Sequence, residues 1–277
     1  MMQSTNPPRP GQRPDRIIRA CSAQMAPVWE EPEKTLAKAE ILIRDAAAGG
    51  ADIICFPEQV FTGWDPVSHE HIQDSSGMIV SFLKKAARDA GIAIIGSIRE
   101  RSVPSPRNTA VVISSEGTIL TTYAKIHLFS PALENTAFSP GTRLGTFTLG
   151  TLKCGLAICY DLRFPEVFSA YAAEGVQAVF VPSAWPASRI RHWELFITAR
   201  AAENQMYVIG VNTTGKTPVD IYDGTSMTAD PNGALISHAG DAEQLIFSAI
   251  DPAVADAARS AFPVGKDRRV ALYRDLA

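Results

Sequence analysis

The 277-residue sequence lacks several features that common protein classes require. It has only four cysteines, Cys21, Cys55, Cys154 and Cys159, without the spacing of a zinc site or a secreted disulfide framework. It has no glycine-rich phosphate loop, which argues against a nucleotide-dependent reaction, and no apolar run long enough to span a membrane. The net charge is −3 with no basic stripe, so nucleic acid is not expected as a partner. We expect a soluble, cytoplasmic protein without a cofactor.

What is present fits one α/β domain. Hydrophobic residues make up 46% and charged residues 20% of the chain, which is typical of a globular protein with a sizeable core. Residues 1–15 are rich in proline and lack the apolar centre of a signal peptide, so they are predicted to form a disordered tail. No linker-like segment interrupts residues 16–277, which we interpret as a single domain.

Strand-like and helix-like segments alternate in both halves of the chain. Periodicity predicts helices over residues 32–48, 77–90, 165–175 and 192–205, and one that begins at Asp251-Pro252. Strands are predicted over residues 16–24, 52–56, 92–98, 108–114, 119–124, 144–149, 154–158, 178–182, 207–212, 225–229 and 245–250. Hairpin-like strands exclude a purely parallel sheet. The near-continuous apolar strands favour two mixed sheets packed face to face, with helices outside.

Three reactive side chains each follow a strand-like run. Cys159 comes directly after Leu156-Ala157-Ile158 and precedes a helical segment, where α/β proteins commonly place a nucleophile. Glu58 follows a second apolar run, and Lys125 follows a third. Each has an ordinary alternative, because unpaired cysteines usually fill cores, and a glutamate or lysine after a strand is usually solvated. Together they supply a nucleophile, a base and a cation for an oxyanion.

The motifs FPEQVF (56–61), YAKIHLF (123–129) and CYDLRFPE (159–166) occur in this order. In this arrangement the chain resembles the nitrilase superfamily of carbon–nitrogen hydrolases, from about residue 16 to the C-terminus. The resemblance implies a four-layer α-β-β-α sandwich that forms a homodimer or a higher homo-oligomer. It also implies Glu58 as the general base, Lys125 as the cation that stabilises the transition state and Cys159 as the nucleophile.

The family carries a second glutamate between the lysine and the cysteine, and Glu134 is the match in this chain. It would orient Lys125 or the substrate; the alternative is a carboxylate on a surface loop. A thiol is mostly protonated at neutral pH, so Glu58 is expected to take its proton and pass it to the departing ammonia. Lys125 and the backbone N–H of Tyr160 are expected to hold the oxyanion.

The substrate is predicted from the residues near the cysteine. CYDLRFPE and the run 182–208 resemble the amidase branch that contains omega-amidases and deaminated-glutathione amidases, whereas true nitrilases usually have Trp-Glu in place of Tyr160-Asp161. The candidates for the substrate pocket are Phe61, Arg163, Trp185, Arg189 and Trp193. An arginine there could bind a substrate carboxylate, although each of the five could equally be a packing or surface residue. The expected substrate is the terminal amide of a short oxo-dicarboxylic acid monoamide, such as 2-oxoglutaramate or 2-oxosuccinamate.

Other interpretations remain open. The chain could act on deaminated glutathione, on an aliphatic amide or on a nitrile, or it could be a catalytically silent scaffold of the same fold, which its intact catalytic positions disfavour. A cysteine–histidine protease site would need a histidine beside Cys159, and the five candidates are His69, His71, His127, His192 and His238. His69 and His71 lack a third ligand nearby, so a metal site is not expected.

Overall fold

The structure is a computed structural model that describes residues 17–275, and the predicted tail, residues 1–15, lies outside the described residues. One six-stranded sheet has the order β14-β1-β2-β3-β4-β5. Its strands are β1 (Ile18–Gln24), β2 (Ile53–Cys55), β3 (Ala93–Glu100), β4 (Arg107–Ile113), β5 (Ile119–Ala124) and β14 (Gln244–Ile250). β1, β2 and β3 run parallel, and the other three strands pair antiparallel with their neighbours.

The second six-stranded sheet has the order β13-β12-β9-β8-β7-β6. Its strands are β6 (Thr146–Leu149), β7 (Leu152–Leu156), β8 (Ala178–Ser183), β9 (Tyr207–Asn212), β12 (Met227–Ala229) and β13 (Leu235–His238). Here too three central strands, β7, β8 and β9, are parallel and the outer strands are antiparallel. A separate two-stranded ribbon joins β10 (Thr214–Lys216) and β11 (Ile221–Asp223).

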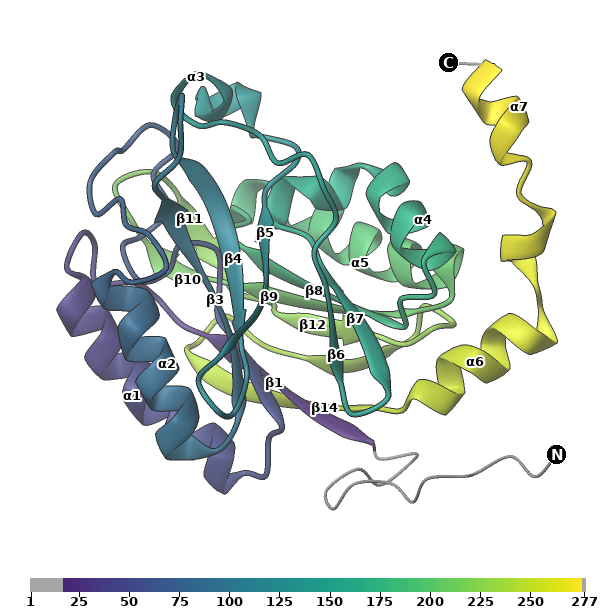
Figure 1. The fold of residues 1–277 in the computed structure, drawn as a ribbon, viewed down its shortest axis with the longest axis horizontal. Helices are drawn as coiled ribbons and strands as arrows, with labels where there is room; N and C mark the ends of the chain where they lie inside the picture. Colours follow the sequence, from purple (N-terminus) through teal and green to yellow (C-terminus); the bar gives the residue numbers. More distant parts are fainter. Residues whose placement is uncertain (1–16, 276–277) are drawn as a thin grey trace, which may run out of the picture.

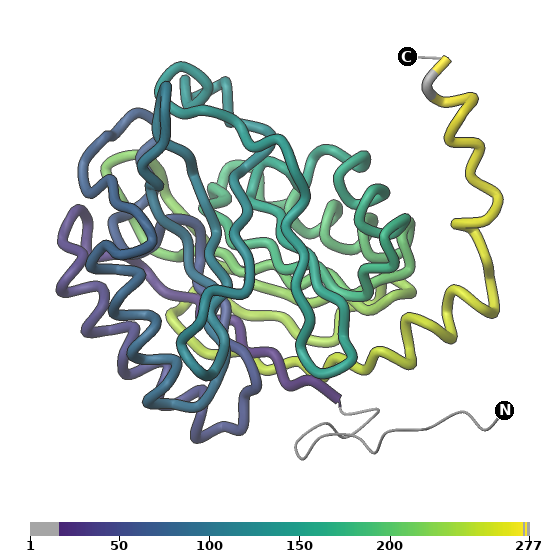
Figure 2. The backbone as a smooth tube through the Cα atoms, viewed as in Figure 1, coloured from purple at the N-terminus to yellow at the C-terminus, as the bar shows by residue number. Residues whose placement is uncertain are grey.

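Helices cover the outer faces of both sheets (Figure 1). α1 (Pro32–Ala48) and α2 (Met78–Ala90) lie against the first sheet, and α4 (Pro165–Ala173) and α5 (Ile190–Asn204) lie against the second. Shorter helices are η1 (Ser130–Ala132), α3 (Glu134–Ala137), η2 (Cys159–Arg163), η3 (Ala187–Arg189) and η4 (Val264–Asp267). At the C-terminus, α6 (Pro252–Ala261) and α7 (Val270–Asp275) run along the outside of the molecule (Figure 2).

The sequence determines where the helices begin and end. α1 begins with Pro32, whose missing N–H costs nothing in the first helical turn. α2 ends at Gly91, which adopts the left-handed backbone conformation (φ 68°) that favours glycine. α6 begins after Asp251, whose carboxylate accepts a hydrogen bond from the Ala253 N–H. None of the helices within residues 17–275 combines the length and the apolar character needed to cross a membrane.

Alternating side chains build two cores from one strand. Ile53 and Cys55 of β2 contribute to the core between the two sheets, whereas Ile54 joins the core under α1 and α2. Residues on opposite faces of a strand point in opposite directions, so a continuously apolar strand must be covered on both sides. The predicted four-layer α-β-β-α sandwich of two mixed sheets is confirmed.

The differences from the prediction are local. β10, β11 and β13 were not predicted because the first two are short and carry polar and exposed residues and the third is largely exposed, so none shows an apolar run. The strand predicted over 154–158 is β7, which ends at Leu156. Cys159 therefore lies at the start of η2, three residues beyond the strand.

Candidate active site

Glu58, Lys125, Glu134 and Cys159 meet in a buried cluster. Glu58 lies three residues beyond β2, Lys125 directly follows β5, and Cys159 opens η2 after β7. The Lys125 Nζ donates to Glu58 Oε1 at 2.8 Å and to Glu134 Oε2 at 2.8 Å. All four side chains are almost completely buried. Packing the two sheets face to face therefore brings a thiol, an ammonium and two carboxylates to one place.

The turn that carries Cys159 is held by Asp161. Cys159 has φ 42°, in the left-handed region that a non-glycine residue rarely adopts. The Asp161 carboxylate accepts hydrogen bonds from the Ile158 N–H at 2.9 Å, from the Tyr123 hydroxyl at 2.7 Å and from the His127 N–H at 2.9 Å. These bonds tie the cysteine turn to the end of β5, where Lys125 lies. The surrounding structure thereby maintains the strained backbone that presents the thiol.

Both carboxylates are fixed by further donors. Glu58 Oε1 also accepts from the Asn108 amide at 2.7 Å, and Glu58 Oε2 accepts from the Ala184 N–H at 3.1 Å. Glu134 Oε1 accepts from the same amide at 3.0 Å, and its Oε2 accepts from the Phe129 N–H at 2.7 Å. Glu134 thus contacts Lys125 directly and is not a surface carboxylate.

Burial and the neighbouring charges shift the pKa values of this cluster. Burial raises the pKa of Glu58, and the Lys125 cation only partly offsets that effect. Burial opposes the charged form of Lys125, but the carboxylates of Glu134 and Glu58 outweigh it, so the Lys125 pKa is raised. Burial, and then the Glu58 charge, raise the pKa of the Cys159 thiol, while Lys125 lowers it. The resting thiol is therefore protonated beside a base that can take its proton.

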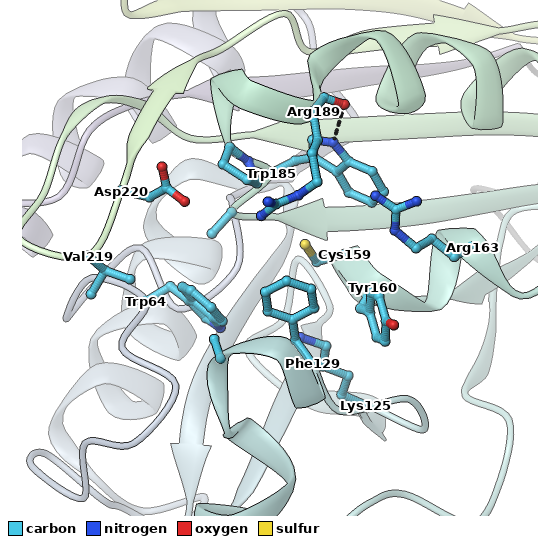
Figure 3. A pocket seen from close by; sticks show the side chains of 13 residues that line it. Trp64, Lys125, Phe129, Cys159, Tyr160, Arg163, Trp185, Arg189, Val219 and Asp220 are labelled. Carbon is cyan, nitrogen blue, oxygen red and sulfur yellow. Dashed lines mark hydrogen bonds between the residues drawn. The ribbon is translucent and has the colours of Figure 1, made fainter.

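The thiol opens into a pocket, which Figure 3 shows. The pocket is lined by Trp64, Lys125, Phe129, Ala132, Cys159, Tyr160, Arg163, Ala184, Trp185, Pro186, Arg189, Val219 and Asp220. Three of the five predicted substrate residues, Arg163, Trp185 and Arg189, are among them. The walls near the sulfur are largely aromatic, and the two guanidinium groups lie on the same side of the pocket as Trp185 (Figure 3).

The two pocket arginines are held by aromatic rings rather than by acids. The Arg163 guanidinium lies 4.8 Å from the centre of the Trp185 ring, and its Nη2 is 3.3 Å from His192 Nδ1. The Arg189 guanidinium lies 5.4 Å from the centre of the Phe129 ring. Neither guanidinium is paired with a carboxylate within residues 17–275, although the Asp220 carboxylate lines the same pocket.

Phe61 and Trp193 do not line the pocket, contrary to the prediction. Phe61 is fully buried in the core under α1 and α2, where its ring packs against Phe56. Trp193 is fully buried between α5 and the second sheet, and its indole N–H donates to the Thr225 carbonyl. Both side chains are apolar and lie in the two cores instead.

Several residues of the site were not predicted. Trp64, Phe129, Val219 and Asp220 reach the pocket from loops, and loop residues carry no periodic signal that would place them there. Asn108 is the second residue of β4, after Arg107, and the residues that follow it in the strand are apolar or hydroxylic; a carboxamide in such a position was the one available signal.

Three of the five histidines contact groups other than Cys159. The His127 Nδ1 lies 2.9 Å from Asp161 Oδ1, and its ring stacks on Phe164. His69 Nε2 contacts the Ala137 carbonyl at 3.1 Å, and His71 Nε2 lies 3.2 Å from Glu30 Oε2. Within residues 17–275, no three His, Cys, Asp or Glu side chains are grouped so that they could hold a metal ion.

Comparisons with known proteins agree with this geometry. The sequence model of the carbon–nitrogen hydrolase family matches residues 19–260. The chain is 34% identical over 247 residues to a 2-oxoglutaramate amidase of Bacillus subtilis (strain 168), covering 88% of this chain and 95% of that protein. It is 31% identical over 270 residues to a human omega-amidase, covering 94% and 91%. A structure of the amidase from Nesterenkonia sp. AN1 in complex with butyramide superposes with a TM-score of 0.82 at 28% identity, covering 94% and 97%.

Proposed function

The chain belongs to the carbon–nitrogen hydrolase family and is an enzyme that hydrolyses amides, and from this premise we propose that it is an omega-amidase. Its substrate is the terminal carboxamide of a small carboxylate-bearing molecule, such as 2-oxoglutaramate or 2-oxosuccinamate, and its products are the free acid and ammonia. The relatives that act as omega-amidases and as a 2-oxoglutaramate amidase support this substrate class.

One observation carries the proposal. Arg163 and Arg189 line the same pocket as Cys159, and neither has a carboxylate partner in the described chain. A guanidinium binds a carboxylate through two parallel hydrogen bonds, which fixes both the position and the orientation of the ligand. A carboxylate bound there would hold the amide at the other end of a short substrate near the sulfur. The aromatic walls would cover its methylene groups.

The first half of the reaction forms a thioester. Glu58 accepts the thiol proton, and the Cys159 sulfur attacks the amide carbon to form a C–S bond and an oxyanion. Lys125 and the Tyr160 backbone N–H stabilise that oxyanion, an interaction of a kind whose loss typically costs about 3–4 kcal/mol. Glu58 then gives its proton to the amide nitrogen, the C–N bond breaks and ammonia leaves.

The second half regenerates the enzyme. Water enters where ammonia left, Glu58 takes one of its protons, and the oxygen attacks the thioester carbon. The C–S bond breaks as the second tetrahedral intermediate collapses, which releases the acid and returns the proton from Glu58 to the sulfur. Glu58 shuttles one proton in each half, while Glu134 keeps Lys125 in place.

Ammonia release from a panel of amides tests the proposal. The panel contains 2-oxoglutaramate, 2-oxosuccinamate, deaminated glutathione and butyramide, and Cys159→Ala serves as the blank. We expect the highest kcat/KM for one of the two oxo-acid monoamides. A higher value for deaminated glutathione would support the same amidase branch but reject the assignment of the pocket to a short oxo-acid monoamide. A higher value for butyramide would reject the carboxylate-binding arginines.

An aliphatic amidase is the second candidate. The Nesterenkonia amidase has been solved with butyramide, and the pocket wall of this chain includes Trp64, Phe129 and Val219, which suit an uncharged alkyl group. In that case Arg163 and Arg189 would only pack against the aromatic walls, and their replacement would change the turnover of butyramide and of 2-oxosuccinamate to the same extent.

The remaining features of the proposal concern the whole molecule. We propose one domain over residues 16–277, a homodimer or higher homo-oligomer, and a cytoplasmic location. The four free cysteines suit a reducing compartment such as the cytoplasm. The exposed side chains of Phe262, Val270 and Tyr273 on the C-terminal segment support self-association. Light scattering on the purified protein tests the assembly, since a monomeric mass at micromolar concentration would reject it.

A further inference from the structure

We propose that Asn108 is a positioning residue of the reaction: its amide holds Glu58 and Glu134 on either side of Lys125 and keeps Glu58 aimed at the cysteine. The inference rests on the proposed role of Glu58 as the proton carrier. It adds to the glutamates, the lysine and the cysteine a neutral side chain that orients the base without contacting the substrate.

The register of the sheet places Asn108 beside Lys125. β4 and β5 pair antiparallel, with Thr109 opposite Ala124, and the Lys125 N–H donates to the Asn108 carbonyl at 2.8 Å. The backbones of the two residues are therefore locked together at the end of the ladder. Their side chains reach the same pair of carboxylates from neighbouring strands.

The hydrogen-bond network determines which way the amide of Asn108 points. Its Nδ2 lies 2.7 Å from Glu58 Oε1 and 3.0 Å from Glu134 Oε1. Only the NH₂ group can face two carboxylates, because the amide oxygen would be repelled by both. Asn108 is fully buried, and no group of residues 17–275 donates a hydrogen bond to its Oδ1. A buried polar atom without a partner destabilises the fold. The two hydrogen bonds that the NH₂ group donates offset this cost and account for an asparagine at this buried position.

The hydrogen bond from Asn108 makes the two oxygens of Glu58 unequal. Oε1 is occupied by Lys125 and Asn108, whereas Oε2 accepts from the Ala184 N–H, and the Cys159 thiol is within hydrogen-bonding reach of the same carboxylate. Without Asn108, Oε1 would keep one donor, and the carboxylate could rotate about its last bond toward Lys125. Asn108 thus fixes the plane of the carboxylate that exchanges a proton with Cys159 and with the nitrogen of the substrate.

Asn108 also favours the ionised form of Glu58. The charged or titratable groups that act on Glu58 are Lys125, which lowers its pKa, and Glu134, which raises it; the hydrogen bond from Asn108 lowers it. Cys159 and the Tyr222 hydroxyl are the other titratable groups coupled to Glu58. Loss of the amide therefore moves the protonation of Glu58 to higher pH, and the acidic limb of the kcat/KM profile should follow.

The test compares Asn108→Ala and the isosteric Asn108→Asp with Asn204→Ala. Asn204 is a matched control because it is also a buried asparagine with one side-chain donor bond, to the Arg200 carbonyl, in α5 and away from the carboxylates. With the preferred amide, we expect Asn108→Ala to lower kcat up to about 100-fold with little change in KM, and to move the acidic limb of the kcat/KM profile to higher pH. Asn108→Asp adds a third carboxylate and should lower kcat further.

A second readout does not depend on the substrate. Cys159 is the one cysteine that lines the pocket, and Cys21, Cys55 and Cys154 are fully buried, so the rate of iodoacetamide alkylation followed by intact mass reports on Cys159. The acidic limb of the alkylation rate follows ionisation of Glu58, the base that takes the thiol proton, so we expect this limb to move to higher pH in Asn108→Ala and to stay at the wild-type position in Asn204→Ala. If both profiles stay unshifted in a folded Asn108→Ala protein, the inference is wrong. If wild-type protein hydrolyses no amide but the alkylation profile shifts, the proposed function fails and Asn108 keeps its role.

Discussion

Replacing Lys125 with methionine should destabilise the protein and abolish turnover, because both depend on the buried Lys125 cation. The substitution keeps the chain length and removes a cation that is in contact with two buried carboxylates, each 2.8 Å from Nζ. Removing one partner of a buried ion pair typically costs 3–5 kcal/mol because a desolvated charge is left unpaired. For a domain of this size that corresponds to a melting temperature lower by roughly 6–20 °C.

The loss should depend on pH in a defined direction. Burial already raises the pKa of Glu58 above its ordinary value of 4.5, and loss of Lys125 removes the effect that opposes it. The folded state then binds more protons than the unfolded state, so stability falls as pH rises from about 4.5 through the raised pKa. The Lys125→Met protein should therefore melt closest to wild type in acid and farthest from it at alkaline pH.

Differential scanning calorimetry from pH 5 to pH 8 measures this effect, with circular dichroism to verify the fold. Lys85→Met is the matched control, because Lys85 pairs with Asp89 on an exposed helix surface, where an ion pair contributes little. The double variant Lys125→Met/Glu134→Gln removes one of the unpaired carboxylates, so it should regain stability without regaining activity. A Lys125→Met protein that melts as the Lys85→Met protein does, at every pH, would refute the buried ion cluster.

Two further outcomes follow from the same cluster and a third from the pocket arginines. Glu58→Gln should lower kcat nearly as far as Cys159→Ala, and the double variant should be scarcely slower than either single one, because residues that act as a unit are not additive; a product of two modest defects in steady-state kinetics would contradict this. Glu134→Gln removes a charge that raises the pKa of Glu58, so the acidic limb of kcat/KM should move to lower pH, and an upward shift would count against the assignment. Arg163→Met and Arg189→Met should raise KM for 2-oxosuccinamate more than for butyramide; equal effects on both amides would show that neither guanidinium binds the carboxylate.

The architecture could be predicted because its strands and helices are long and periodic. α1 runs from Pro32 to Ala48, and β5 and β9 also have the predicted bounds, since turn residues or glycines flank clear apolar patterns. The ribbon of β10 and β11 could not be predicted, because its short strands carry polar and exposed residues and contain no apolar run, unlike the equally short but fully buried β2.

The catalytic cluster and the pocket differ in how much the sequence reveals. Glu58, Lys125 and Cys159 each follow a strand, and strand ends are positions that a linear pattern can locate. The structure places Cys159 in a strained turn held by Asp161, a contact that no spacing rule encodes. Trp193 was a pocket candidate because the run 182–208 resembles the omega-amidase branch, and only packing shows that its side chain points into the core.

The pocket arginines also have a property that the sequence pattern does not encode. Arg163 and Arg189 do line the cavity, but the sequence could not show that both lack an acidic partner. That property depends on which carboxylates approach from other elements, and these are distant in the chain. Asn108 could not be identified from the sequence for the same reason. Its proposed role depends on contacts with Glu58 and Glu134, which only the folded structure brings together.

The covalent intermediate on Cys159 is the most direct test of the account. Wild-type protein is mixed with a slowly hydrolysed amide of the preferred class, quenched in acid and measured by intact-protein mass spectrometry, with Cys159→Ala in parallel. The account predicts an adduct with the mass of the substrate minus ammonia, located on Cys159 by peptide mapping and missing from the variant. Steady ammonia release by the Cys159→Ala protein, or an adduct that maps to another residue, would contradict it.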